Sequence, residues 1–226
     1  MDNQDSQNKF FVMYMLAAAL LAVIFFVHVF AGWVVTEGGW IENLTAAGHF
    51  MAVGLFICVG GRRFLREHFS TCLLVLAFGL RELDFDKRFT TMGIFKTRFY
   101  KSAGVPVDEK IIGLFVIGIL LLVVWDVIRK YSKSWRAGKK HLDAVSCGVL
   151  LVGALLVLSK TADGFRRRLR EFGMSVSDGV SFNITRAEEI LEMGLPIVII
   201  IAFFAYQARG KRKTGPHLSA GALGEE

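Results

Sequence analysis

The sequence has few of the patterns that identify well-known soluble enzymes. It has 3 cysteines and no Cys-x-x-Cys pair, so neither a disulfide framework nor a cysteine zinc site is indicated. It also has no His-Glu-x-x-His zinc motif and no Gly-x-x-x-x-Gly-Lys-Ser/Thr phosphate loop. These absences exclude P-loop nucleotide chemistry and leave the hydrophobic pattern as the strongest signal.

Long apolar runs are what the sequence does contain. The chain has 226 residues, of which 54% are hydrophobic, and its mean hydropathy is +0.48. A helix needs about 20 apolar residues to cross a bilayer, and several runs approach or exceed that length. They cover residues 10–35, 44–61, 111–128, 142–159 and 190–206. The sequence therefore predicts an all-α, polytopic transmembrane helical bundle rather than a soluble domain.

A sixth and weaker run covers residues 70–80, and it gives a prediction of about six spans in one domain, residues 1–208. The expected spans lie near residues 10–35, 43–61, 66–85, 110–129, 141–161 and 188–208. Residues 209–226 are basic and then polar, which is typical of a disordered tail.

The basic residues indicate which way the chain crosses the membrane. Short basic clusters at 62–66, 129–140 and 209–213 all fall on one side of a six-span arrangement, while the loop 36–43 has no Lys or Arg. The positive-inside rule then places both termini in the cytoplasm. A five-span alternative, in which the third run is re-entrant, would export the dense cluster 129–140. We expect the bacterial inner membrane to be the location.

The net charge of +7 is explained by basic residues at the membrane surface. In a soluble protein it would raise nucleic acid as a partner. Here most basic residues lie in the links between apolar runs, where they contact lipid headgroups. We therefore expect membrane lipids and no nucleic acid as partners. The sequence identifies no protein partner.

Charged residues follow the third run immediately. Eleven residues of helix (70–80) cover about 16 Å, roughly half of the hydrocarbon core. If this run crosses the bilayer, Arg81, Glu82 and Asp84 lie at membrane depth, with Lys87 shortly after. Ionisable residues inside a membrane are costly and indicate a functional site.

Further polar residues occur at the outer ends of the other predicted helices. Glu42 and Asn43 open the second span, and Glu42 shares a helix face with His49, seven residues later. Glu189 and Glu192 begin the last span, and Arg166 follows the fifth. Acids at a helix N-terminus also stabilise the helix dipole, which is the alternative explanation of Glu42 and Glu189. Their common depth favours one polar pocket in the outer leaflet.

Carboxylates and histidines at membrane depth suit acid–base chemistry on a lipid or lipid-linked substrate. The predicted catalytic residues are Glu42, His49, Glu82, Asp84 and Glu189. The predicted substrate-binding residues are Asn43, Arg81, Lys87, Arg166 and Glu192. No cofactor is identified. A divalent metal would use His49, Glu42 and Glu82. The alternatives are a small ion- or proton-coupled transporter and a membrane assembly or scaffold protein.

Overall fold

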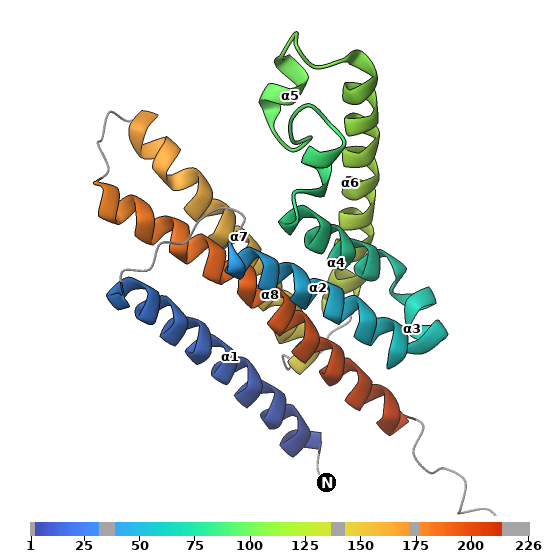
Figure 1. The fold of residues 1–226 in the computed structure, drawn as a ribbon. Helices are drawn as coiled ribbons and strands as arrows, with labels where there is room; N and C mark the ends of the chain where they lie inside the picture. Colours follow the sequence, from blue (N-terminus) through green and yellow to red (C-terminus); the bar gives the residue numbers. More distant parts are fainter. Residues whose placement is uncertain (1–2, 32–38, 137–142, 172–176, 214–226) are drawn as a thin grey trace, which may run out of the picture.

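The computed structural model describes residues 3–31, 39–136, 143–171 and 177–213, and these residues form helices and no strand (Figure 1). In chain order the elements are α1 (Asn3–Ala31), α2 (Trp40–Cys58), α3 (Gly61–Glu67), α4 (Phe69–Glu82), the 3-10 helix η1 (Phe85–Arg88), α5 (Thr97–Lys101), α6 (Val107–Arg136), α7 (Ala144–Glu171) and α8 (Asp178–Lys213). The predicted fold class is confirmed.

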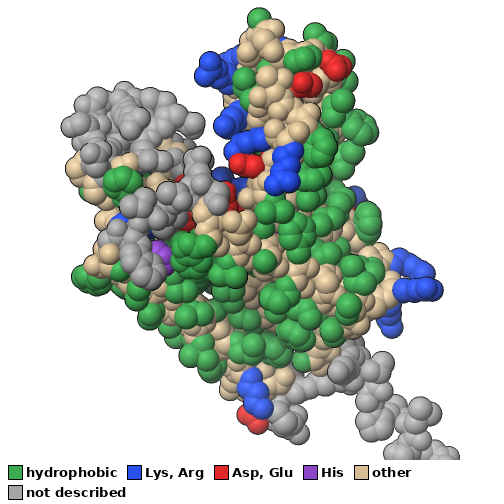
Figure 2. Space-filling view, in the orientation of Figure 1, with side chains coloured by type: hydrophobic (Ala, Val, Ile, Leu, Met, Phe, Trp, Pro, Cys, Tyr) green, Lys and Arg blue, Asp and Glu red, His purple; other side chains and the backbone are tan. Residues whose placement is uncertain are grey.

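Five of the described helices are long and apolar enough to cross a membrane. They are Gln4–Ala31, Trp40–Cys58, Val107–Ser132, Ala144–Ala162 and Gly179–Arg209. Hydrophobic side chains cover most of the visible face of the bundle, and charged ones lie mainly at its ends and around α5 (Figure 2). An apolar surface of this extent fits a helix bundle that is surrounded by lipid rather than by water.

The third predicted span, residues 66–85, differs from expectation. The helix is interrupted at His68, between α3 and α4. Helix α4 has only 14 residues, about 21 Å of helix, and is therefore not among the five candidate spans. Contacts still show that α4 runs antiparallel to α8. The His68 ring lies 4.9 Å from that of Tyr206, and Arg81 contacts Glu192. The six-span count and the cytoplasmic termini stay predictions.

Helix α8 is the centre of the bundle, and α1, α2 and α7 pack around it (Figure 1). Close approach depends on small residues at two points. A Cβ atom at Gly48 of α2 would lie 2.9 Å from the Pro196 ring of α8. A Cβ atom at Gly148 of α7 would lie 2.7 Å from Ala202 of α8. Helix α8 continues to Lys213, into the predicted tail, and residues 214–226 lie outside the described part.

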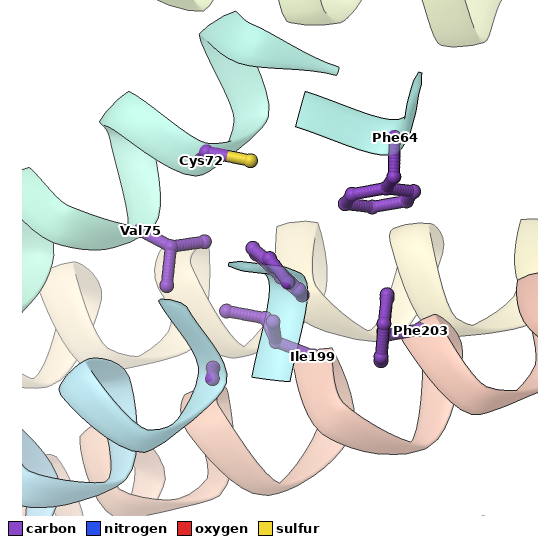
Figure 3. Close-up of a cluster of buried hydrophobic side chains, with 7 residues drawn as sticks. Phe64, Cys72, Val75, Ile199 and Phe203 are labelled. Atoms are coloured by element: carbon purple, nitrogen blue, oxygen red, sulfur yellow. The ribbon is translucent and has the colours of Figure 1, made fainter. Parts of the chain in front are cut away.

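A cluster of buried apolar side chains joins α3 and α4 to α2 and α8 (Figure 3). Its members are Ala52, Phe56, Phe64, Cys72, Val75, Ile199 and Phe203. The ring of Phe56 lies 5.0 Å from that of Phe203 and 5.3 Å from that of Phe64. Cys72 is a free thiol within this packing, as the position of the cysteines in apolar runs predicts. Helix α4 is too short to be anchored by lipid alone. Its contacts with this cluster therefore hold it in place.

Helix α6 lies to one side of the bundle. It packs mainly against α4 and only slightly against α7, and its upper half is covered by the segment that contains α5 (Figure 1). In that segment Ile94, Phe99 and Val105 form a small buried cluster. Only 6% of the residues in the most apolar stretch of α6 are buried, so most of this helix faces outward.

A buried hydrogen bond ties α1 to α7 and gives a stability prediction. The Tyr14 hydroxyl donates to the carbonyl oxygen of Ala144 at 2.9 Å. Tyr14→Phe removes this hydrogen bond and is expected to cost about 1 kcal/mol. Tyr100→Phe is the matched control, because the buried Tyr100 hydroxyl has no hydrogen-bond partner in the described part of the chain. Thermal denaturation in detergent should show a loss for Tyr14→Phe alone. Equal Tm values for the two variants would contradict the assignment.

Candidate functional site

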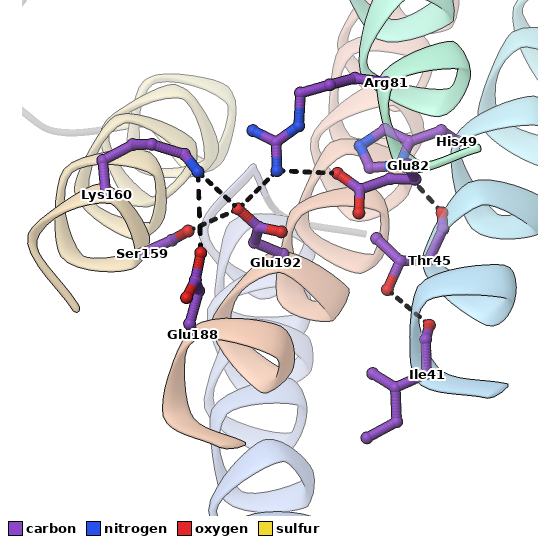
Figure 4. Close-up of polar contacts among 9 residues, drawn as sticks. All are labelled: Ile41, Thr45, His49, Arg81, Glu82, Ser159, Lys160, Glu188 and Glu192. Carbon is purple, nitrogen blue, oxygen red and sulfur yellow. Dashed lines mark hydrogen bonds and ion pairs between the residues drawn. The ribbon is translucent and has the colours of Figure 1, made fainter. Parts of the chain in front are cut away.

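Charged side chains from three helices meet where the apolar sequences of α7 and α8 end. Helix α7 is apolar up to Leu158, and α8 is apolar from Met193 onward. We call the group that lies between these points the charged cluster (Figure 4). It consists of Arg81 and Glu82 from α4, Ser159 and Lys160 from α7, and Glu188 and Glu192 from α8.

Glu192 is the centre of the charged cluster. One of its carboxylate oxygens accepts hydrogen bonds from Arg81 Nη2 at 2.7 Å and from Ser159 Oγ at 2.7 Å. The Lys160 ammonium lies 3.2 Å from the same oxygen. The Glu192 side chain is only 6% exposed. A buried carboxylate is tolerated because these partners replace the water it has lost.

The remaining pairs surround this centre. Arg81 Nη2 also lies 3.3 Å from Glu82, and the Lys160 ammonium lies 3.8 Å from Glu188. Glu188 and Glu192 are four residues apart on α8, so both face α7. The Arg81 side chain is 31% exposed and the Lys160 side chain 48%, so the charged cluster is open on the side of its two cations.

Several acidic groups lie near one another at this site. The charges of Glu42, Glu82, Glu188 and Glu192 all act on Glu189. Arg81 and Lys160 are basic side chains that pair with Glu82, Glu188 and Glu192. The carboxylates predicted from separate helices therefore do converge on one region.

His49 is a buried base next to this region. Its ring is 0% exposed, and Nδ1 lies 2.9 Å from the carbonyl oxygen of Thr45. A carbonyl only accepts, so Nδ1 carries the proton, and in the neutral ring Nε2 has a free lone pair. Nε2 has no hydrogen-bond partner in the described structure. The charges of Arg81 and Glu192 act on this ring.

Glu189 is the second polar group without a bonded partner. It is 9% exposed, and no hydrogen bond or ion pair joins it to another described residue. Glu192, by contrast, has three partners only one turn further along α8. Among the described residues, the site thus combines a carboxylate that has three partners with one that has no hydrogen-bond or ion-pair partner.

Pro196 shapes the helix directly below Glu192. A proline lacks an N–H, so the carbonyl of Glu192, four residues earlier, loses its usual helical donor. Pro196 also packs against Gly48, the residue that precedes His49 on α2. This contact fixes the two helices at the point where His49 and Glu192 approach each other.

Other predicted site residues lie elsewhere. Asp84 has a left-handed backbone (φ 49°), which turns the chain away after α4, and its carboxylate pairs with Lys87 on the surface. Asn43 is exposed and donates from its side-chain amide to the carbonyl of Gly39. The backbone of Arg166 lies in α7, but its side chain is outside the described structure.

Sequence reasoning missed Ser159 and Lys160. A lysine after an apolar run usually marks the end of a span, and a serine beside it carries no signal of its own. Their position at the level of Glu192 could be recognised only by pairing α7 with α8. The metal alternative gains no support, because no described group of three His, Cys, Asp or Glu side chains is arranged to hold an ion.

The fold and the composition of its helices define an α-helical integral membrane protein, and the charged cluster is its most distinctive feature. No family model, no curated protein and no solved structure matches the chain. The function is therefore argued from the site alone.

Proposed function

We propose that the region of the charged cluster is a catalytic site that acts on a lipid or lipid-linked substrate from the outer half of the membrane. The observation that carries this proposal is the position of two polar groups, Glu189 and His49 Nε2, that have no hydrogen-bond partner among the described residues and lie beside the network around Glu192. An unpaired buried polar group costs free energy, so its retention favours a functional role.

The proposed roles follow from the contacts. Glu189 and His49 exchange protons with the reacting group, because each has a free oxygen or nitrogen. Arg81 and Lys160 hold an anionic part of the substrate on the open side, as their exposed fractions permit. Glu192 positions both cations. Glu42 and Glu82 contribute negative charge that acts on Glu189. Asp84, Lys87 and Asn43 take no part.

The location supports a lipid as the substrate class. The charged cluster lies where the apolar parts of two candidate spans end, which is the depth of lipid headgroups and ester linkages. A lipid that moves laterally in the membrane reaches this depth without leaving the bilayer.

Replacing Glu189 tests the proposal. Glu189→Gln keeps the shape of the side chain and removes its capacity to exchange a proton, and loss of one acid–base group is expected to lower turnover by about 100-fold. The protein is reconstituted into vesicles of phosphatidylethanolamine, phosphatidylglycerol and cardiolipin, and new lipid products are followed by mass spectrometry.

The control for this experiment is Glu67→Gln. Glu67 is an exposed carboxylate on α3, and the hydrogen bond that it accepts from Arg63 holds its pKa below the usual value. It precedes α4, whereas Arg81 lies in the last turn of α4, so its replacement should leave turnover unchanged. Equal turnover by Glu189→Gln and the native protein would refute the catalytic role.

Proton transport is the second candidate, and the presence of several carboxylates close to Glu189 favours it. Against it, the region between the charged cluster and the inner ends of α4 and α8 is lined mainly by apolar side chains. A proton flux into vesicles that Glu189→Gln abolishes, without any change in lipid composition, would assign the site to transport.

A further inference from the structure

An apolar cavity lies directly inward of the charged cluster. Its volume is about 110 Å³, and it separates α4 and α6 on one side from α7 and α8 on the other. Its lining includes Leu74, Val75, Phe78, Val149, Val152 and Ile199. Val75 and Ile199 also belong to the cluster in Figure 3, so the cavity continues the protein core toward α6 and α7.

The two ends of the cavity differ in chemistry. At one end the Phe78 ring lies 5.9 Å from the ring of His49, next to the charged cluster. At the other end the lining includes His68, Tyr131 and Tyr206. Aromatic side chains with a polar tip are typical of the membrane–water interface. The cavity therefore extends from the neighbourhood of His49 to a second group of side chains with polar tips.

The length of the cavity matches a single lipid chain. Phe78 and His68 are ten residues apart on and just before α4, which corresponds to about 15 Å of helix. That distance is about half of a hydrocarbon core of about 30 Å, the depth that one leaflet occupies. Apolar cavities of about 150 Å³ stay dry and bind small hydrocarbons, so this cavity has the size for a segment of chain.

We propose that this cavity holds a segment of one hydrocarbon chain of a phospholipid whose polar part lies at the charged cluster. The part concerning the headgroup rests on the proposed function. Three features support a bound hydrocarbon chain: the apolar lining of the cavity, the candidate spans that flank it, and the polar side chains at its ends. Entry is lateral, between α6 and α7, because these helices pack only slightly against each other.

The test uses phosphatidylglycerol that carries a diazirine in the middle of one acyl chain. The full-length protein is reconstituted in vesicles with this lipid, irradiated and digested, and the labelled residues are identified by mass spectrometry. Label on Leu74, Val75 or Val152 is the expected result. Label confined to outward-facing residues such as Leu121 and Leu122 of α6 would overturn the proposal.

A pair of neighbouring substitutions sharpens the test. Val149→Phe places a ring in the cavity and is expected to reduce the internal label by about fivefold, which corresponds to about 1 kcal/mol of overpacking. Leu150→Phe enlarges a side chain that is 39% exposed and absent from the lining, so the label should not change. Equal internal label in both variants would also overturn the proposal.

The outcome separates this inference from the proposed function. Internal label in a protein that converts no lipid would support the chain site and reject the catalytic role. Lipid conversion that depends on Glu189, without internal label, would reject the chain site and leave the catalytic role standing.

Discussion

Glu192→Leu is expected to lower stability by about 3–5 kcal/mol, which is the cost of leaving a buried charge without its partner. The substitution removes the oxygen that accepts from Arg81 and Ser159 and that attracts Lys160. Among the ion pairs between described residues, Arg81 then keeps the one with Glu82, at 3.3 Å. The readout is the apparent Tm in detergent, measured beside the native protein.

A double variant distinguishes loss of the ion pair from loss of packing. Arg81→Met removes the stranded charge, so Arg81→Met with Glu192→Leu should recover much of the Tm that Glu192→Leu loses. Glu67→Leu is the control, because the Arg63–Glu67 pair is exposed and contributes little. If the double variant is less stable than Glu192→Leu alone, the charged cluster is not the source of the effect.

Gly148→Val is expected to destabilise the bundle by about 3 kcal/mol, near the upper end of the cost of overpacking. A Cβ atom at this position would lie 2.7 Å from Cβ of Ala202 and would also overlap the Tyr14 hydroxyl. Both α1 and α8 must therefore move away from α7. The Tyr14–Ala144 hydrogen bond is lost in the same step.

Gly153→Val on the same helix is the matched control. An added Cβ there meets nothing within 4 Å, so the substitution should change the Tm little. The double variant Gly148→Val with Tyr14→Phe lacks the Tyr14 hydroxyl but keeps the overlap with Ala202. It should therefore recover at most part of the Tm that Gly148→Val loses. Similar Tm losses for Gly148→Val and Gly153→Val would show that helix propensity, and not close packing, sets the effect.

The helices with the longest apolar runs could be predicted from the sequence because a long apolar segment has few stable alternatives to a membrane helix. The break at His68 could not, because no glycine or proline marks it. The His68 ring packs against the rings of Phe64 and Tyr206. Tyr206 lies 139 residues after Glu67, the residue that precedes His68. Contacts of this separation are visible only in the folded chain.

The charged cluster, too, could be predicted only in part from the sequence. Arg81, Glu82 and Glu192 stand out in the sequence because a charge beside an apolar run is costly. Lys160 does not stand out, because a lysine at that position is ordinary in a membrane protein. Asp84 follows the third apolar run only two residues after Glu82, yet the left-handed turn at Asp84 directs it to the surface. Backbone conformation, rather than residue type, separates the two acids.

The shortness of α4 has a consequence for the order in which the chain is made. Arg81 and Glu82 leave the ribosome before α7 and α8 exist, and Glu192 is synthesised 111 residues after Arg81. A segment of 14 residues that ends in two charges is a poor substrate for insertion by itself. Biogenesis of the central site is therefore completed only when the last helix arrives, so Arg81 lacks its closest acidic partner while the next 111 residues are synthesised.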